Sequence, residues 1–232
     1  MTLPAEEESV KKLLLSVYKT LLKAYGPQQW WPADSIFEIM IGAILTQNTQ
    51  WFNVKKAIRN LKEEKLLEPR KMRFTTPERL ASFIVHTGYY NVKAKRIRNL
   101  LDFLMANDLD FYKMKQEDTA TLREKLLAVN GIGPETADSI LLYALDHQTF
   151  VIDAYTRRLF SRLKAEWEWM KFVTYDELKA FFEESLPKDK ALYNEYHALI
   201  VVHSKDICKS TPFCSQCCLR DICEHYHTAG ED

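Results

Sequence analysis

The segment 126–138 reads LLAVNGIGPETAD and joins two expected helices through a short turn. The first helix should end at Gly131, and Pro134 occupies the first position of the second helix, where its missing N–H does no harm. Gly131 and Gly133 permit a sharp turn and leave backbone N–H groups unobstructed at the start of the second helix. Such a turn serves either as a structural helix–turn–helix or as a cradle for a phosphate oxygen.

Helix signals dominate the rest of the sequence. Ser35, Thr121 and Thr174 are each followed three residues later by glutamate, the pattern of a capping box at a helix N-terminus. Thr76 precedes a proline that suits a first helical position. The chain has only 6 glycines and little strict alternation of apolar and polar residues, which argues against strands. We therefore predict an all-α protein with about ten helices.

The composition limits the classes of function. Lysine plus arginine and aspartate plus glutamate each number 32, so any affinity for nucleic acid must come from local basic patches. No apolar run reaches the roughly 18 residues that a membrane span needs. The acidic residues 6–8 do not suit a signal peptide. We expect a cytoplasmic protein, associated with the nucleoid if bacterial, in which disulfides do not form.

The cysteines are confined to one short segment. All 5 lie between residues 208 and 223, and four follow the spacing Cys208-x5-Cys214-x2-Cys217-x5-Cys223. Thiols clustered in this way in a cytosolic protein predict a metal centre. The spacing alone leaves structural zinc and an iron–sulfur cluster both open, and Cys218 is an adjacent alternative to Cys217.

Taken together, these motifs resemble those of the helix–hairpin–helix DNA glycosylase superfamily, the endonuclease III relatives. The resemblance rests on the G-I-G-x-x-T-A hairpin at 131–137, the V-I-D segment at 151–153 and the G-Y-Y-N-V-K-A block at 88–94. The I-L-T-Q-N-T segment at 44–49 is similar to the family's L-[ST]-x-Q segment, and the cysteines match with a first gap one residue shorter. The motifs occur in the family's order over roughly residues 34–225.

The resemblance implies two lobes with the active site between them. Residues 34–146 would form a six-helix barrel domain that contains the hairpin, and residues 1–33 and 147–232 would form the second lobe. The loop 208–223 would hold a structural [4Fe–4S] cluster, bound by Cys208, Cys214, Cys217 and Cys223.

Asp153 matches the family's catalytic aspartate. A carboxylate near C1′ stabilises the oxocarbenium charge that develops on the deoxyribose as an N-glycosidic bond breaks, and it orients water. The alternative is that Asp153 only caps the helix expected from Ala154, and the two roles are compatible. The hairpin upstream favours catalysis.

Glu135 occupies the position at which relatives with lyase activity carry a lysine. A carboxylate cannot form the imine of that reaction, so AP-lyase activity is not expected. Together with Trp30-Trp31-Pro32, Glu135 resembles the branch of monofunctional 3-methyladenine DNA glycosylases. Alkylated purines are cationic and stack on indole, so these residues would line the base pocket. The tryptophans could instead only pack an N-terminal helix, and Lys205, placed toward the pocket by the resemblance, could be a surface lysine.

The resemblance also suggests how double-stranded DNA is held. Lys93 begins a segment of four cations without an acid, which predicts phosphate contacts. Gln47 or Asn48 is expected to fill the gap left by a flipped base, and the sequence does not distinguish between them. The hairpin would hold the DNA backbone through Gly131, Gly133 and Thr136.

The predicted function is monofunctional hydrolysis of the N-glycosidic bond of alkylated purines in damaged double-stranded DNA. We expect a monomer with no membrane partner. One alternative is an endonuclease III-like glycosylase for oxidised or mismatched bases. The other is a non-catalytic iron–sulfur protein that binds DNA.

Overall fold

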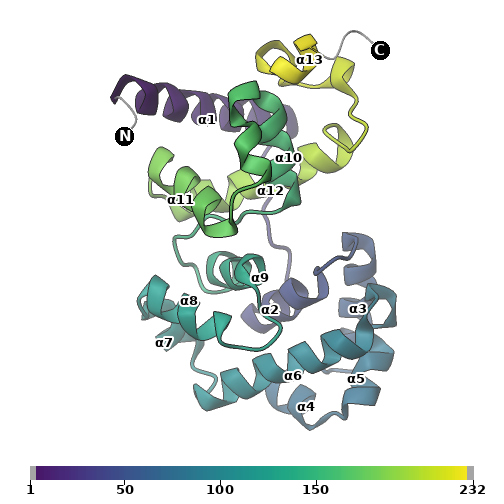
Figure 1. Ribbon diagram of the computed structural model, residues 1–232. Coiled ribbons are helices and arrows are strands. Elements are labelled where there is room, and N and C mark those ends of the chain that lie inside the picture. The colour runs from purple at the N-terminus through teal and green to yellow at the C-terminus, as the bar shows by residue number, and fades with distance from the viewer. Residues whose placement is uncertain (1–3, 229–232) are drawn as a thin grey trace. The chain divides into compact units, whose positions relative to one another are not determined.

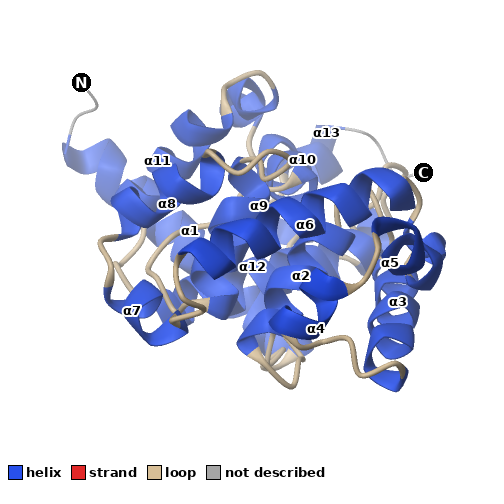
Figure 2. Cartoon of the chain, turned by 90° about the horizontal axis from the view of Figure 1, so that it is seen from below, coloured by secondary structure: helices blue, strands red, loops and turns tan. Residues whose placement is uncertain are grey.

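A computed structural model describes residues 4–228 of the chain, and every regular element among them is a helix. No strand occurs in these residues (Figures 1 and 2), which confirms the predicted all-α class. They divide into two compact units: a central unit, Trp31–His147, and a terminal unit that combines residues 4–30 with residues 148–228. Within the described part of the chain, none of the helices has the length and apolar character that a membrane span requires.

The central unit is built around α2 (Ile36–Leu45), a helix of 10 residues that is apolar on nearly all sides. Such a helix belongs in the interior of a domain. Its N-terminus is capped by the Ser35 hydroxyl, which accepts a hydrogen bond from the Glu38 N–H at 3.1 Å. The other elements of this unit are, in chain order, α3 (Trp51–Glu63), α4 (Pro69–Phe74), α5 (Pro77–Phe83), η1 (Val85–Thr87), α6 (Tyr90–Ala106), α7 (Phe111–Gln116), α8 (Thr119–Leu127), α9 (Pro134–Ser139) and the π-helical turn η2 (Ile140–Ala144).

Two more of the predicted helix starts are confirmed and one is wrong. Thr174 forms the full capping box with Glu177, and Thr76 caps α5. Thr121 does not cap a helix, because α8 has already begun and Asp118 is its N-cap. The Asp118 carboxylate accepts a hydrogen bond from the Thr121 N–H at 2.9 Å. Aspartate is a strong N-cap residue, so the helix starts at the first suitable side chain.

The terminal unit joins the two ends of the chain around an aromatic core. Phe150 stacks on Phe182 with ring centroids 4.7 Å apart. The buried Tyr196 hydroxyl donates to the Leu14 carbonyl at 2.7 Å, which links the last long helix to the first. The elements of this unit are α1 (Pro4–Tyr25), α10 (Ala154–Leu163), η3 (Ala165–Lys171), α11 (Tyr175–Ser185), α12 (Lys190–Asp206), η4 (Cys214–Gln216), η5 (Arg220–Ile222) and α13 (Glu224–Thr228).

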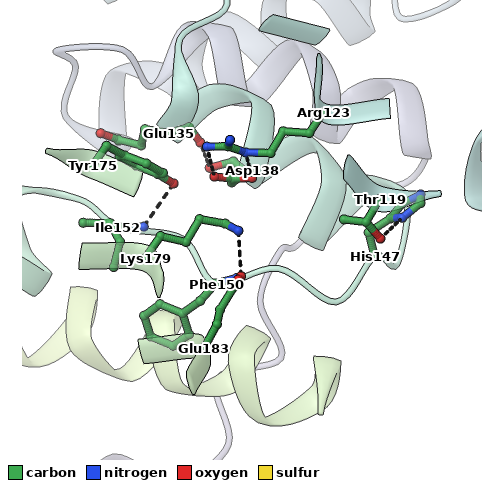
Figure 3. A network of polar contacts seen from close by, with 11 residues as sticks. Thr119, Arg123, Glu135, Asp138, His147, Phe150, Ile152, Tyr175, Lys179 and Glu183 are labelled. Atoms are coloured by element: carbon green, nitrogen blue, oxygen red, sulfur yellow. Dashed lines mark hydrogen bonds and ion pairs between the residues drawn. The ribbon is translucent and has the colours of Figure 1, made fainter. Parts of the chain in front are cut away.

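Side chains of α11 fix the extended segment that leads to Asp153 (Figure 3). The Phe150 N–H donates to the Glu183 carboxylate at 2.7 Å, and the Ile152 N–H donates to the Tyr175 hydroxyl at 3.2 Å. Lys179 pairs with the same Glu183 carboxylate at 2.8 Å. Backbone donors outside a helix need such partners when they are buried. The path of the chain into Asp153 is therefore set by contacts within the terminal unit.

Candidate functional site

The hairpin is closed by an ion pair between its two helices. Arg123 of α8 donates to both oxygens of Asp138 of α9, at 2.9 and 3.2 Å (Figure 3). The Asp138 side chain is fully buried. A bidentate pair of this kind fixes geometry as well as charge, so it holds α8 and α9 at a set angle across the turn.

Gly131 is required by the packing inside this turn. Its φ is +96°, and a Cβ built there would lie 2.3 Å from Cγ of Arg96 on α6. No other residue type fits without moving the arginine or the turn. Gly133, the N-cap of α9, has open space around it and is exposed. The turn thus packs closely on α6 at Gly131 and is open at Gly133.

Gln47 and Asn48 are the two alternatives for the residue that fills the gap left by a flipped base. Gln47 is anchored to the hairpin, and Asn48 is exposed. The Gln47 amide donates to the Gly131 carbonyl at 3.1 Å and to the Thr136 hydroxyl at 2.9 Å. Its oxygen accepts a hydrogen bond from Arg96 at 2.5 Å. Asn48 has a left-handed backbone, with φ of 51°, which asparagine tolerates better than most residues. Gln47 therefore links α2, α6 and the hairpin.

Lys93 does not contact solvent, so the prediction that it binds a DNA phosphate is wrong. The side chain is 1% exposed, and its ammonium donates to the carbonyls of Leu45 and Thr87 and to the Thr49 hydroxyl. Carbonyls at helix ends lack intrahelical partners and attract cations. The ammonium group that suggested a phosphate contact instead donates hydrogen bonds to backbone carbonyls of this protein.

Trp31 belongs to an aromatic cluster in the central unit. Its ring centroid lies 5.2 Å from that of Trp51 and 5.6 Å from that of Tyr143. Its indole also covers Gly42, where a Cβ would approach the ring to 3.0 Å. Trp31 is half-buried and Pro32 is exposed. Trp30 is half-buried and is assigned to the terminal unit, so its place in the pocket stays a prediction.

Asp153 is the N-cap of α10 and also faces a histidine. One carboxylate oxygen accepts from the Thr156 N–H at 2.7 Å and from the Thr156 hydroxyl at 3.0 Å. The other lies 3.4 Å from Nε2 of His197 on α12. Burial by itself would raise the pKa of Asp153, but the neighbouring His197 imidazole and the Thr156 donors outweigh it, so the pKa lies below its ordinary value. The carboxylate is thus kept ionised although it is largely buried.

His197 is a residue of this site that the sequence did not reveal. It lies among apolar residues in the middle of α12, where a histidine carries no distinctive pattern. Lys205, further along the same helix, is exposed and within electrostatic range of Asp153. Partial desolvation lowers the pKa of Lys205, and the negative charge of Asp153 opposes that shift. Its ammonium lies 5.9 Å from the centre of the Tyr155 ring.

Glu135 lies in the first turn of α9 and is exposed. An acidic residue is favourable there because the N-terminal end of a helix carries partial positive charge. Its backbone carbonyl accepts a hydrogen bond from the Ser139 hydroxyl at 2.7 Å. The position holds a carboxylate and offers no amine.

Four cysteines line one small cavity between α10 and the loop that follows α12. They are Cys208, Cys214, Cys217 and Cys223, whereas Cys218 is not part of the lining. The Leu219 N–H points to the Cys217 sulfur at 3.4 Å, and burial raises the pKa of Cys217 to about 12. Among the described residues, no three His, Cys, Asp or Glu side chains converge closely enough to hold a single metal ion.

Comparison with known proteins identifies the family. Residues 41–188 match the HhH-GPD superfamily of base excision DNA repair proteins. The chain is 48% identical over 219 residues to a Methanocaldococcus jannaschii protein with the provisional name of a DNA repair glycosylase, covering 94% of this chain and 98% of that protein. It is 30% identical over 194 residues to endonuclease III of Sulfolobus acidocaldarius, covering 83% of each.

A solved structure of a DNA glycosylase is similar to this chain in both fold and sequence. It is the crystal structure of H. pylori 3-methyladenine DNA glycosylase bound to 1,N6-ethenoadenine, with a TM-score of 0.71 and 33% identity. The match covers 86% of this chain and 97% of the H. pylori chain. The family match and these similarities agree with the hairpin and the buried aspartate seen in the structure. The chain therefore belongs to the HhH-GPD superfamily of base excision DNA repair proteins.

Proposed function

We propose that this protein is a monofunctional glycosylase that hydrolyses the N-glycosidic bond of alkylated purines, of the 3-methyladenine type, in double-stranded DNA. The observation that carries the proposal is the carboxylate of Asp153, held ionised in a largely buried position beside His197. The substrate named for the similar H. pylori enzyme supports the choice of lesion.

Asp153 would act on the sugar. As the C1′–N bond breaks, its electron pair leaves with the base, which becomes neutral because an alkylated purine carries a positive charge beforehand. The carboxylate opposes the positive charge that develops at C1′. A water oxygen bonds to C1′, and the water proton passes to Asp153 and on to solvent. The products are the free base and an abasic site.

The aromatic cluster is suited to a cationic base. Trp31 and Trp51 have half-buried, electron-rich rings, and Tyr143 is buried against Trp31. A positively charged purine stacks on such rings more strongly than a neutral one. Pro32 is exposed next to Trp31, and the Glu135 carboxylate would add favourable negative charge. A cationic base also leaves without help from a general acid, so a single catalytic carboxylate is sufficient.

DNA would be held by the hairpin and by Asn48. Gly133 is open, so a phosphate oxygen can approach the backbone of the turn, with Gly131 and Thr136 holding the turn in place. Asn48 is the better candidate to fill the gap left by the flipped base, because Gln47 is already bound to the hairpin.

The cysteine cavity fits a [4Fe–4S] cluster. Cys208, Cys214, Cys217 and Cys223 line this one cavity and would hold the cluster through their thiolates. The Leu219 N–H and the Arg162 guanidinium approach the Cys217 and Cys208 sulfurs, as donors do around cluster thiolates. The cluster would stabilise the loop, since hydrolysis needs no redox step.

Base release from a panel of damaged duplexes tests the substrate class. Methylated DNA should yield 3-methyladenine, detected by mass spectrometry, whereas duplexes with uracil, a mismatch or thymine glycol should yield no base above the spontaneous rate. Release from thymine glycol or mismatched DNA alone would favour the endonuclease III-like alternative. Release from none would favour a non-catalytic DNA-binding protein.

Borohydride trapping tests the absence of lyase activity. No protein–DNA adduct should form, because Glu135 gives no reducible imine, and the abasic strand should stay uncut until alkali is added. Efficient trapping would show that another amine attacks C1′. Lys205 is then the first residue to substitute, because it lies within the electrostatic range of Asp153.

A further inference from the structure

We propose that Lys93 is a positioning residue that locks two loops of the central unit, residues 46–50 and 87–89, into the arrangement that engages damaged DNA. The inference rests on the proposed function, because it is through Asn48 that the first loop would meet DNA. It gives a role in base excision to a lysine that touches no substrate.

The ammonium of Lys93 directs all of its donors to these loops and to the helix end that precedes the first of them. It donates to the Leu45 carbonyl at 2.8 Å, the Thr87 carbonyl at 2.9 Å and the Thr49 hydroxyl at 2.5 Å. The Thr49 hydroxyl also contacts the Thr87 carbonyl at 2.5 Å. An ammonium group has three protons, so its hydrogen bonding is complete. One side chain of α6 thereby joins two loops that are far apart in sequence.

The acceptors are the points at which two helices end. Leu45 is the last residue of α2, and Thr87 is the last residue of η1. Their carbonyls have no partner within their own helices, so a cation at this place satisfies both at once. The direction in which each loop leaves its helix is therefore set by a single group.

Burying the charge of Lys93 costs free energy, so packing alone does not explain a lysine at this position. Burial, with the nearby Arg96, lowers the pKa of Lys93 to about 8, which shows that the charged form is disfavoured there. An apolar side chain of similar length would avoid that cost. Such an apolar side chain would not supply three directional hydrogen bonds, and these bonds are what fixes the two loops.

Both loops present exposed residues with left-handed backbones. Asn48 has a φ of 51°, and Tyr89 has a φ of 46° and is 76% exposed. A left-handed backbone in residues other than glycine persists only where its surroundings hold it. Lys93 lies beneath both loops and provides that constraint, so its loss should release them without exposing the core.

The test compares Lys93→Met with Arg98→Met in the whole 232-residue chain. Arg98, on the same helix, belongs to the cationic segment expected to contact phosphates, but its guanidinium donates to the carbonyls of Arg73 and Thr75 at the end of α4. Its loss therefore also removes a helix-end contact, but at different loops. The measurements are the thermal midpoint, the single-turnover rate of base release from methylated duplex, and the fluorescence of 2-aminopurine placed beside a tetrahydrofuran abasic analogue.

Both variants should have lower thermal midpoints, but only Lys93→Met should lose base release, by about 10- to 100-fold, as misplaced groups at active sites do. It should also lose the rise in 2-aminopurine fluorescence that reports distortion of the duplex. Thr49→Val, which removes the shared hydroxyl and keeps the shape, should lose about 3- to 10-fold, since part of the contact remains.

Equal release by Lys93→Met and Arg98→Met, at temperatures where both are folded, would overturn the inference alone. If Lys93→Met does not fold, release by Thr49→Val at the wild-type rate would overturn it. A wild-type protein that releases no base and gives no rise in fluorescence would instead refute the proposed function, and this inference with it.

Discussion

Asp153 shows how one carboxylate can cap a helix and still direct its second oxygen to another side chain. The Thr156 donors occupy one oxygen, and the other oxygen faces His197. Because the folded-state pKa lies below the ordinary value, this group stabilises the fold at pH values above about 4 and loses that contribution as the pH falls through the folded pKa. Asp153 is therefore ionised throughout the neutral range, as charge stabilisation requires.

His197→Phe should move the acidic limb of the pH–rate profile to higher pH. Removing the imidazole leaves burial, which raises the pKa of Asp153, opposed only by the Thr156 donors. His197→Gln should shift the profile less, because its amide can still donate a hydrogen bond. The measurement is the single-turnover rate of base release as a function of pH. Superimposable profiles for wild type and His197→Phe would show that His197 does not act on Asp153.

The cations of α6 show that the contacts of a single side chain cannot be predicted from the sequence. Lys93 and Arg98 both lie on α6, and the sequence shows their positive charge. It does not show that both side chains reach carbonyls, because those carbonyls come from helix ends distant in the chain. His197 was missed for the same reason: its partner is brought to it only by the packing of α10 on α12.

At the scale of elements, α10 does more than present Asp153. Arg158 donates to the carbonyls of Ser204 and Cys208 at 3.0 and 2.8 Å. Arg162 donates to the carbonyls of Lys209 and Ser210 at 2.5 and 2.8 Å. These carbonyls lie at the end of α12 and in the segment that follows, so two arginines of one helix hold the start of the cysteine loop. The loop and the aspartate are thereby carried by the same helix.

Cys217→Ser should abolish the visible absorption of an iron–sulfur centre and lower the thermal midpoint, whereas Cys218→Ser should do neither. Cys217 lines the shared cavity and Cys218 does not. The measurements are the absorption spectrum and iron content of protein purified without oxygen, followed by thermal unfolding. Colourless wild-type protein with one zinc per chain would contradict the cluster, and loss of colour in Cys218→Ser alone would reverse the choice of ligand.

The whole molecule shows which features local signals can predict. The all-α class follows from caps such as Thr174 and Thr76 and from the scarcity of glycine, and these act within one turn of chain. The cap expected at Thr121 failed because Asp118 starts the helix earlier. The hairpin glycines were identified from their spacing, but the clash that makes Gly131 necessary involves Arg96, which belongs to another helix.

The two compact units carry different parts of the proposed chemistry. The central unit holds the hairpin, the aromatic cluster and the two loops joined by Lys93. The terminal unit holds Asp153, His197 and the cysteine loop. Lysine plus arginine balance aspartate plus glutamate at 32 each, so binding to DNA must depend on local contacts and should weaken as salt is raised.

The most direct test is the single-turnover release of 3-methyladenine from methylated duplex DNA by wild-type protein and by Asp153→Asn. Asparagine can still cap α10 through its amide oxygen, so the fold and the affinity for DNA should be kept. It carries no charge, so the rate should fall by about 100-fold or more, as it does when one electrostatic group is removed from an active site. Release by Asp153→Asn at the wild-type rate would show that Asp153 is only a helix cap and would contradict the proposed function.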